Sequence, residues 1–301
     1  MLTAFYDLAV SPPTFDALGF LATAERKRIE LGEPSLRIVI VPGPDNGFRK
    51  DNLPPRDPKI RMRMLKKIVF KLCKLLPSVE EVVHCETRAD AVAFKTGHVF
   101  PVGYDETHPV MSYGTKLITD AIRAGCLPFR ADQPVTKNDR LIAITLREAR
   151  YWPSRNSNLP EWQKVGRHFL NKGYDVVFVR DTEFATKALP GFRIDSDAAI
   201  SLQSRLALYE TARLNLFVNN GPTALAMLSG NVALLNSKME TADAPCTQAA
   251  YFAAHGMPKG EQLPRPGCHI LWADDRAELL IPAAEAMLDG AAAVAPLTRV
   301  A

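Results

Sequence analysis

Short apolar runs alternate with amphipathic segments along the first half of the chain. Apolar runs cover residues 3–10, 36–43 and 81–85, and helical spacing appears at about 14–31 and 58–76. Runs this short and nearly continuous are typical of strands that helices cover on both faces of a parallel sheet. The alternation therefore predicts an α/β layer structure.

The second half repeats this plan after residues 126–139, which lose all periodicity and make the best linker. Its expected elements are strands at 140–146, 174–179, 214–218, 231–235 and 268–272, with helices at about 160–172, 199–212, 222–228 and 275–288. We predict two facing, doubly wound, Rossmann-like domains, an N-terminal one at 1–135 and a C-terminal one at 136–290. A loose Ala-rich tail follows at 291–301. Ligands of such sheets bind at the carboxyl ends of the strands, in the cleft that the domains form.

Composition fits an ordinary globular protein, with 47% hydrophobic and 23% charged residues among 301. No apolar run approaches the roughly 18–20 residues of a membrane span, and the N-terminus lacks the pattern of a secretory signal. We therefore expect a cytoplasmic protein. The five cysteines and six histidines show no disulfide or metal spacing, so no metal and no cofactor is expected. Dinucleotide, P-loop and hydrolase-elbow motifs are missing from the sequence.

Positive charge is concentrated between residues 49 and 74, where ten Lys/Arg meet two Asp. The whole chain carries only +4, too little to indicate nucleic-acid binding. Residues 59–76 combine apolar residues on one side with lysines and arginines on the others, which predicts an amphipathic helix. Such a helix could lie peripherally on the inner face of an anionic membrane. The alternative is a core-packed helix with a solvated basic face.

The stretch LNLFVNNGPTALAMLSGNVALL, residues 214–235, places an Asn-Asn-Gly-Pro corner between a strand and a helix. Proline suits the first helical turn, glycine permits a tight turn, and asparagine caps free N–H groups. A helix start at a strand end offers unpaired amides and a positive dipole end to a phosphate. The alternative is a well-capped turn without a ligand.

This stretch resembles a segment of the ADP-heptose:lipopolysaccharide heptosyltransferases that reads Asp-Ser/Thr-Gly-Pro-x-His-Leu-Ala. In that family, the helix start after Gly-Pro holds the diphosphate of a nucleotide-sugar donor. The residues that match are Gly221, Pro222, Leu225 and Ala226, whereas Asn219, Asn220 and Ala224 replace Asp, Ser/Thr and His. The resemblance implies the GT-B glycosyltransferase fold and donor contacts by Asn219, Asn220, Gly221, Pro222 and Thr223. Glu210 lies where many GT-B enzymes carry an acidic group for the donor ribose or sugar.

Arginines follow the first strand of the second half, in ITLREARYWPSRNSNLPEW. Arg147 and Arg155 could each clamp diphosphate oxygens with paired N–H donors. Their placement is similar to that in GT-B fucosyltransferases, where an arginine just after this strand binds the GDP diphosphate. The alternative is a solvated basic loop.

Two loops of the first half hold the remaining candidates. Thr14 is a natural N-cap with Asp16 in the first turn, which is a sufficient structural role. The functional alternative makes Asp16 the general base that an inverting transferase needs, and heptosyltransferases have an Asp in a similar place. Asp45 and Arg49, in the irregular loop 41–57, could contact an acceptor, although an Asp-Asn-Gly turn also explains Asp45.

These observations predict a metal-independent glycosyltransferase that moves a hexosyl-type sugar from a nucleotide-diphosphate sugar to a cell-surface polysaccharide or glycolipid acceptor. The expected partners are that nucleotide sugar, bound by the C-terminal domain, and a saccharide or lipid-linked acceptor, bound by the N-terminal domain, with no nucleic acid. Two alternatives stay open: a nucleotide-sugar epimerase on the same fold, and a non-catalytic GT-B-like binding or scaffold protein.

Overall fold

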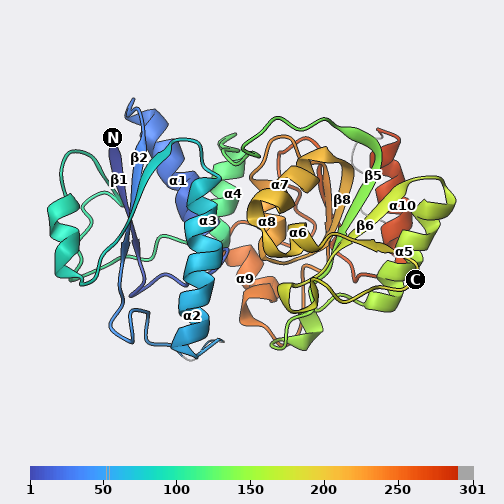
Figure 1. The fold of residues 1–301 in the computed structure, drawn as a ribbon, viewed down its shortest axis with the longest axis horizontal. Helices are drawn as coiled ribbons and strands as arrows, with labels where there is room; N and C mark the ends of the chain where they lie inside the picture. Colours follow the sequence, from blue (N-terminus) through green and yellow to red (C-terminus); the bar gives the residue numbers. More distant parts are fainter. Residues whose placement is uncertain (52, 54, 291–301) are drawn as a thin grey trace. The chain divides into compact units, whose positions relative to one another are not determined.

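A computed structural model describes residues 1–51, 53 and 55–290, and the chain divides into two compact units between Asp132 and Gln133 (Figure 1). Both units are α/β with fully parallel sheets, which confirms the predicted Rossmann-like architecture. The predicted tail, 291–301, lies outside the described residues. The ligand roles assigned to each half from the sequence remain predictions.

The first unit contains a four-stranded sheet in the order β3-β2-β1-β4. Its strands are β1 (Leu2–Asp7), β2 (Leu36–Val41), β3 (Val79–His84) and β4 (Val99–Phe100). Its helical segments are α1 (Ala17–Glu30), α2 (Pro58–Met64), the π-helix η1 (Leu65–Val69), α3 (Phe70–Lys74), the 3₁₀-helix η2 (Ala89–Phe94) and α4 (Thr115–Arg123). The helix expected at 58–76 is therefore present as one run, with a π-turn at its centre.

Aromatic side chains pack on both faces of this first sheet. Phe5 of β1 stacks on Tyr104 with ring centroids 4.2 Å apart. On the other face, Phe20 of α1 contacts Tyr6 and Phe100 at 5.1 and 5.5 Å. Alternate residues of β1 thus face opposite layers, as its short apolar run predicts.

The second unit contains a six-stranded sheet in the order β10-β9-β8-β5-β6-β7. Its strands are β5 (Asn138–Thr145), β6 (Asp175–Val179), β7 (Arg193–Ile194), β8 (Ala212–Val218), β9 (Leu234–Ser237) and β10 (Cys268–Ile270). Its α-helices are α5 (Leu159–Asn171), α6 (Ser196–Ile200), α7 (Leu202–Thr211), α8 (Gly221–Met227), α9 (Ala249–Ala254) and α10 (Ala277–Leu288). Three 3₁₀ turns add η3 (Pro153–Arg155), η4 (Thr182–Phe184) and η5 (Pro245–Thr247).

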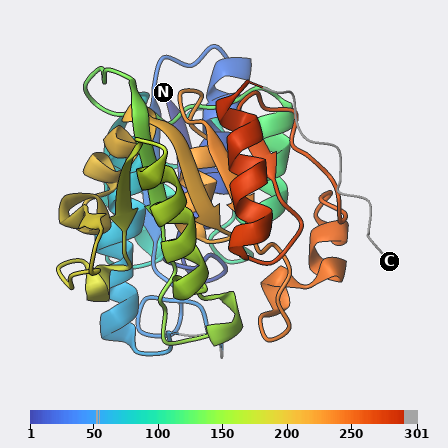
Figure 2. The ribbon, with the colours of Figure 1, turned by 90° about the vertical axis from the view of Figure 1, so that its right-hand side faces the viewer.

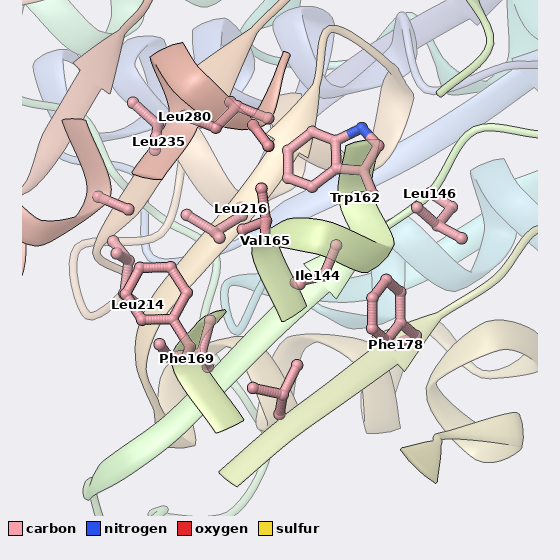
Figure 3. Close-up of a cluster of buried hydrophobic side chains, with 14 of the residues drawn as sticks. Ile144, Leu146, Trp162, Val165, Phe169, Phe178, Leu214, Leu216, Leu235 and Leu280 are labelled. Atoms are coloured by element: carbon pink, nitrogen blue, oxygen red, sulfur yellow. The ribbon is translucent and has the colours of Figure 1, made fainter. Parts of the chain in front are cut away.

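The main core of the second unit lies between the sheet and the helices α5 and α10, which lie over one face of it (Figure 2). Ile144, Leu216 and Leu235 from three strands meet Trp162 of α5 and Leu280 of α10, all fully buried (Figure 3). Leu141 and Ala143 point to the opposite face, where Leu208 of α7 packs. The alternation along β5 explains why its sequence reads as a continuous apolar run.

Several predicted boundaries differ from the structure for local reasons. β1 ends at Asp7 instead of residue 10, because the N–H groups of Ala9 and Val10 turn back to Asp7. The helix expected at 199–212 is two helices, since Ser201 ends α6 and caps α7 by accepting from the N–H of Ser204. The strand expected at 231–235 lies at Leu234–Ser237.

Candidate functional site

The strand order of the second unit creates a topological switch point beside β5. The chain continues from β5 through β6 to β7 on one side, and then from β8 through β9 to β10 on the other. In open parallel sheets, ligands bind where the connections diverge in this way, at the carboxyl ends of the strands. The loop after β5 and the turn after β8 both leave the sheet at this point, and both were singled out from the sequence.

Arg147, one of the two arginines predicted to bind a diphosphate, is buried and forms hydrogen bonds within its own loop. Its guanidinium donates to the carbonyls of Trp152 and Tyr151, at 3.1 and 2.9 Å, and to the Asn156 side chain. The pKa of Arg147 is lowered by burial and, secondarily, by the positive charge of Arg155. The structure thus gives Arg147 a loop-organising role that the sequence did not reveal.

Arg155 connects the two motifs that the sequence treated separately. Its guanidinium donates to the carbonyl of Asn219, 3.3 Å away, and lies 3.5 Å from the Cys246 sulfur. The same group lies over the Trp152 ring, 5.7 Å from its centroid. Its Nε is buried and has no hydrogen-bond partner among the described residues. A buried donor of this kind is normally paired, so Arg155 offers an unfilled contact at the switch point.

The Asn-Asn-Gly-Pro turn forms the helix start that the sequence predicts. Asn220 is the N-cap of α8, and its side chain accepts from the N–H of Thr223 at 3.0 Å. The Thr223 hydroxyl is buried and contacts the Val218 carbonyl at 3.0 Å. Thr223 therefore offers a ligand no free hydroxyl, whereas Asn219, Gly221 and Pro222 remain half-buried at the strand end.

Glu210 does not join this group. It lies near the end of α7, just before β8 begins, and thus at the amino-terminal edge of the sheet. Its carboxylate is buried and accepts from the Ser229 hydroxyl at 2.9 Å. The seven residues of β8 span roughly 20 Å, so Glu210 is separated from the Asn219 turn by the length of a strand.

In the first unit, Asp16 lies directly before α1, in the connection that follows β1. Its carboxylate accepts from the Thr14 hydroxyl at 2.5 Å. The expectation that Thr14 caps the helix is wrong, because α1 begins only at Ala17 and Thr14 instead holds Asp16. Burial raises the pKa of the neighbouring Tyr6 well above its ordinary value, and the charge of Asp16 contributes.

The loop after β2 holds Arg49 but leaves Asp45 in solvent. Asp45 and Phe48 exchange backbone hydrogen bonds around a tight turn whose Asn46 has a left-handed φ of 50°. Arg49 donates to the Tyr113 hydroxyl at 2.6 Å. The buried Arg61 donates to the Arg49 carbonyl at 2.9 Å, so one residue of the basic segment fastens this loop.

Asp7, which the sequence interpretation overlooked, is a buried carboxylate with partners on both of its oxygens. Arg88 donates to both of its oxygens at 2.8 Å, and the Tyr104 hydroxyl donates at 2.6 Å. Its position as a charged residue within the first apolar run is the sequence signal that could have identified it as a candidate. Because its partners occupy both oxygens, Asp7 serves to fix the strand end and not to bind a ligand.

The basic helix exposes its lysines as its amphipathic pattern predicts. Lys66, Lys67, Lys71 and Lys74 are exposed, whereas Leu72 and its apolar neighbours are buried. Within the described ranges, none of these four lysines takes part in an ion pair. No helix among those residues is long and apolar enough to cross a membrane, and no group of three or more His, Cys, Asp or Glu there is arranged to hold a metal ion.

Comparison with known proteins gives structural likeness alone. No family model matches the sequence, and no curated protein matches it. Among solved structures, E. coli ADP-heptose lipopolysaccharide heptosyltransferase II is similar with a TM-score of 0.53 and 7% identity, covering 96% of this chain and 98% of that one. The E. coli heptosyltransferase WaaC with ADP-2-deoxy-2-fluoro heptose gives 0.45 at 11% identity, covering 97% and 100%.

The iron-containing dodecameric glycosyltransferase TibC from enterotoxigenic E. coli H10407 gives a TM-score of 0.41 at 14% identity, covering 92% of this chain and 67% of that one. Of these three, the likeness to heptosyltransferase II is close enough to carry an argument, and at this identity it concerns the fold. It extends over both units. The chain therefore has the two-unit, Rossmann-like α/β fold of a GT-B-type heptosyltransferase.

Proposed function

We propose that this chain is a glycosyltransferase whose second unit binds the diphosphate of a nucleotide sugar at the β5–β8 switch point. The observation that carries the proposal is Arg155, a half-buried arginine with an unpaired Nε, positioned against the Asn219 carbonyl. A guanidinium can present two parallel N–H donors to phosphate oxygens. The fold likeness to a heptosyltransferase supports this choice of ligand over other nucleotides.

The proposed reaction transfers the glycosyl group to an acceptor hydroxyl of a surface polysaccharide or glycolipid precursor. The bond between the anomeric carbon and the diphosphate breaks as the acceptor oxygen attacks, and the diphosphate leaves with the electron pair. Arg155 and the amides at the start of α8 would stabilise that charge, so the transfer would need no metal ion. Asp16 is our candidate for the base that takes the acceptor proton, if the reaction inverts the anomeric centre.

The donor site is tested by thermal shift with ADP-, GDP-, UDP- and CDP-sugars. We expect one nucleotide class to stabilise the protein, and Arg155→Lys to weaken its binding about tenfold or more because lysine lacks the planar fork. Arg150→Lys is the matched control, since Arg150 belongs to the same loop but is exposed and paired with Glu183. No stabilisation by any nucleotide sugar would overturn the proposal and favour a non-catalytic scaffold.

Two further measurements test glycosyl transfer against epimerisation and test the role of Asp16. Incubation with UDP-N-acetylglucosamine and no acceptor would change the sugar only if the chain were an epimerase. With a donor and an acceptor identified, Asp16→Asn should reduce kcat by about a hundredfold or more while donor affinity stays unchanged. An unchanged kcat in Asp16→Asn would exclude Asp16 as the base.

We also propose that the exposed lysines of the α2–α3 segment contact an anionic surface, such as the membrane that carries a lipid-linked acceptor. Residues 58–76 contain no acidic side chain, and the four exposed lysines named above have no ion-pair partner in the described part of the chain. Each lysine near such a surface contributes about 1 kcal/mol of attraction. Contact of this kind would be peripheral.

A further inference from the structure

A polar pocket of about 450 Å³ lies in the second unit at the carboxyl ends of β9 and β10. Its walls come from three places: the η3 turn, the loop that follows β9, and the residues before α10. Ser154 of the η3 turn adjoins Arg155, and Ser237 at the end of β9 accepts from the N–H of Asn219. The pocket is therefore continuous with the elements that carry the proposed diphosphate site.

Two of the lining residues, Lys238 and Asp275, form an ion pair whose carboxylate is buried. Asp275 is 2% exposed and accepts from the Asn158 N–H at 2.6 Å and from the Trp162 indole at 2.9 Å. Lys238 pairs with its other oxygen at 3.0 Å and donates to the Asn156 carbonyl at 2.7 Å. A buried carboxylate holds its geometry when both of its oxygens are paired, and both oxygens of Asp275 are.

Backbone strain accompanies this pocket. Lys238 has a φ of 52°, in the left-handed region that non-glycine residues rarely adopt. Trp152, directly before the η3 turn, has a φ of 50°. Such conformations tend to cluster at ligand sites, where the surrounding structure holds them.

One wall of the pocket holds an acceptor without a donor. Glu240 pairs with Lys259 through one carboxylate oxygen, while its Oε1 is buried and has no hydrogen-bond partner among the described residues. Of the residues that line the pocket, only Ala242 is apolar. Three carboxylates, from Glu240, Asp274 and Asp275, face two cations, from Lys238 and Arg276. This lining suits hydroxyl donors and disfavours an anion.

We propose that this pocket binds a neutral or amino sugar ring, and that Glu240 accepts a hydrogen bond from one of its hydroxyl groups. A pocket of this volume has room for a sugar ring, and its polar walls match a ligand that carries a hydroxyl on nearly every carbon. The inference rests on the proposed function, in which the ring would be the glycosyl group of the donor bound through Arg155. It adds a preference against uronic acids and other anionic sugars.

The test is ligand-observed NMR of the full chain with glucose, glucosamine and glucuronate, with nucleoside diphosphates measured in parallel. Glucose and glucosamine should bind, and glucuronate should bind at least tenfold more weakly. Glu240→Gln should weaken sugar binding about tenfold and leave diphosphate binding unchanged, because it removes a charge-assisted hydrogen bond. Asp139→Asn, at the amino-terminal edge of the same sheet, is the control and should change neither.

The outcomes separate this inference from the proposed function. Equal binding of glucuronate, unchanged sugar affinity in Glu240→Gln, or no monosaccharide binding would overturn the pocket assignment. If nucleoside diphosphates still bound and Arg155→Lys lowered their affinity, the proposed donor site would stand without the sugar pocket. If sugars bound but no nucleotide did, the pocket assignment would be supported and the transferase proposal would be wrong. An unchanged unfolding midpoint of Glu240→Gln shows that the variant is folded.

Discussion

At the scale of single residues, Arg147 and Arg155 show how one loop uses the same side chain in two ways. Arg147 donates three hydrogen bonds within the loop itself, to Tyr151, Trp152 and Asn156. Arg155 keeps a buried Nε without a partner within the described structure and lies against the next strand's turn. The second arrangement leaves a buried N–H of the guanidinium that a ligand could accept from.

We predict that Arg147→Met lowers the free energy of unfolding of the second unit by about 3 kcal/mol. The change leaves buried carbonyl acceptors without their charged donor, and bonds of this type contribute about 1.5–3 kcal/mol each. Arg150→Met should change stability by less than about 0.5 kcal/mol, because Arg150 is exposed. Urea unfolding followed by tryptophan fluorescence measures both. Undiminished stability together with lost nucleotide binding would return Arg147 to the role of phosphate ligand.

The sequence singles out both arginines of this loop by their position, but it does not show how their surroundings differ. Strand-end position selects both arginines as candidates. Arg147 donates to backbone carbonyls of its own loop because Trp152 has a left-handed conformation. This conformation turns the carbonyls of Trp152 and Tyr151 toward Arg147. Propensity gives no reason to expect a tryptophan in that conformation. Glu210 lies away from the Asn219 turn for a simpler reason, since helical position alone did not show at which end of β8 it would lie.

At the scale of elements, the start of α8 combines a cap with a proposed ligand contact, and substitutions can separate them. Asn220→Ala should lower stability by about 1 kcal/mol, because the Thr223 N–H loses its acceptor. Asn220→Asp should keep the cap and the stability, but its charge would repel a diphosphate. We therefore expect Asn220→Asp to weaken nucleotide binding in calorimetry at an unchanged unfolding midpoint. Equal nucleotide affinity in this variant and the original chain would count against a diphosphate at this turn.

The α2–α3 segment provides a second prediction at this scale. Changing Lys66, Lys67, Lys71 and Lys74 to Gln should weaken co-sedimentation with phosphatidylglycerol vesicles at least tenfold, because each lysine contributes about 1 kcal/mol. Added salt should also weaken vesicle binding by the original chain, since salt screens the attraction between exposed charges.

The control changes four exposed lysines elsewhere, Lys116, Lys164, Lys187 and Lys259, and carries the same total charge. If this control lost as much vesicle binding as the α2–α3 variant, the effect would come from net charge, and the segment would have no special role.

Element prediction succeeded where the apolar pattern was long enough to show a period. The basic helix was expected at 58–76 and runs from Pro58 to Lys74, and α5 and β6 lie within one residue of their expected bounds. The missed strands β4 and β7 have two residues each, too short to show any alternation. Sheet edges of this kind are set by neighbouring strands and not by their own sequence.

At the scale of the whole molecule, the two-domain architecture could be predicted because both halves repeat the same alternation. The strand orders are β3-β2-β1-β4 in the first unit and β7-β6-β5-β8-β9-β10 in the second. In both units, the third, second, first and fourth strands lie side by side in that order. No sequence repeat accompanies it. Right-handed crossovers and short connections restrict a βαβ chain to few orders, so similar topologies arise from dissimilar residues.

Each unit has its own buried core, and this leads to a prediction about unfolding. All three tryptophans, Trp152, Trp162 and Trp272, belong to the second unit, so tryptophan fluorescence reports that unit alone, whereas far-UV circular dichroism reports both. A nucleoside diphosphate at one hundred times its Kd should stabilise the unit that binds it by about 2.7 kcal/mol. We expect the urea midpoint measured by fluorescence to rise. The part of the dichroism transition that reports the first unit should stay at the same urea concentration. Arg155→Lys should abolish most of the rise. A dichroism transition that moves as a whole with the fluorescence would mean that the two units unfold as one cooperative body.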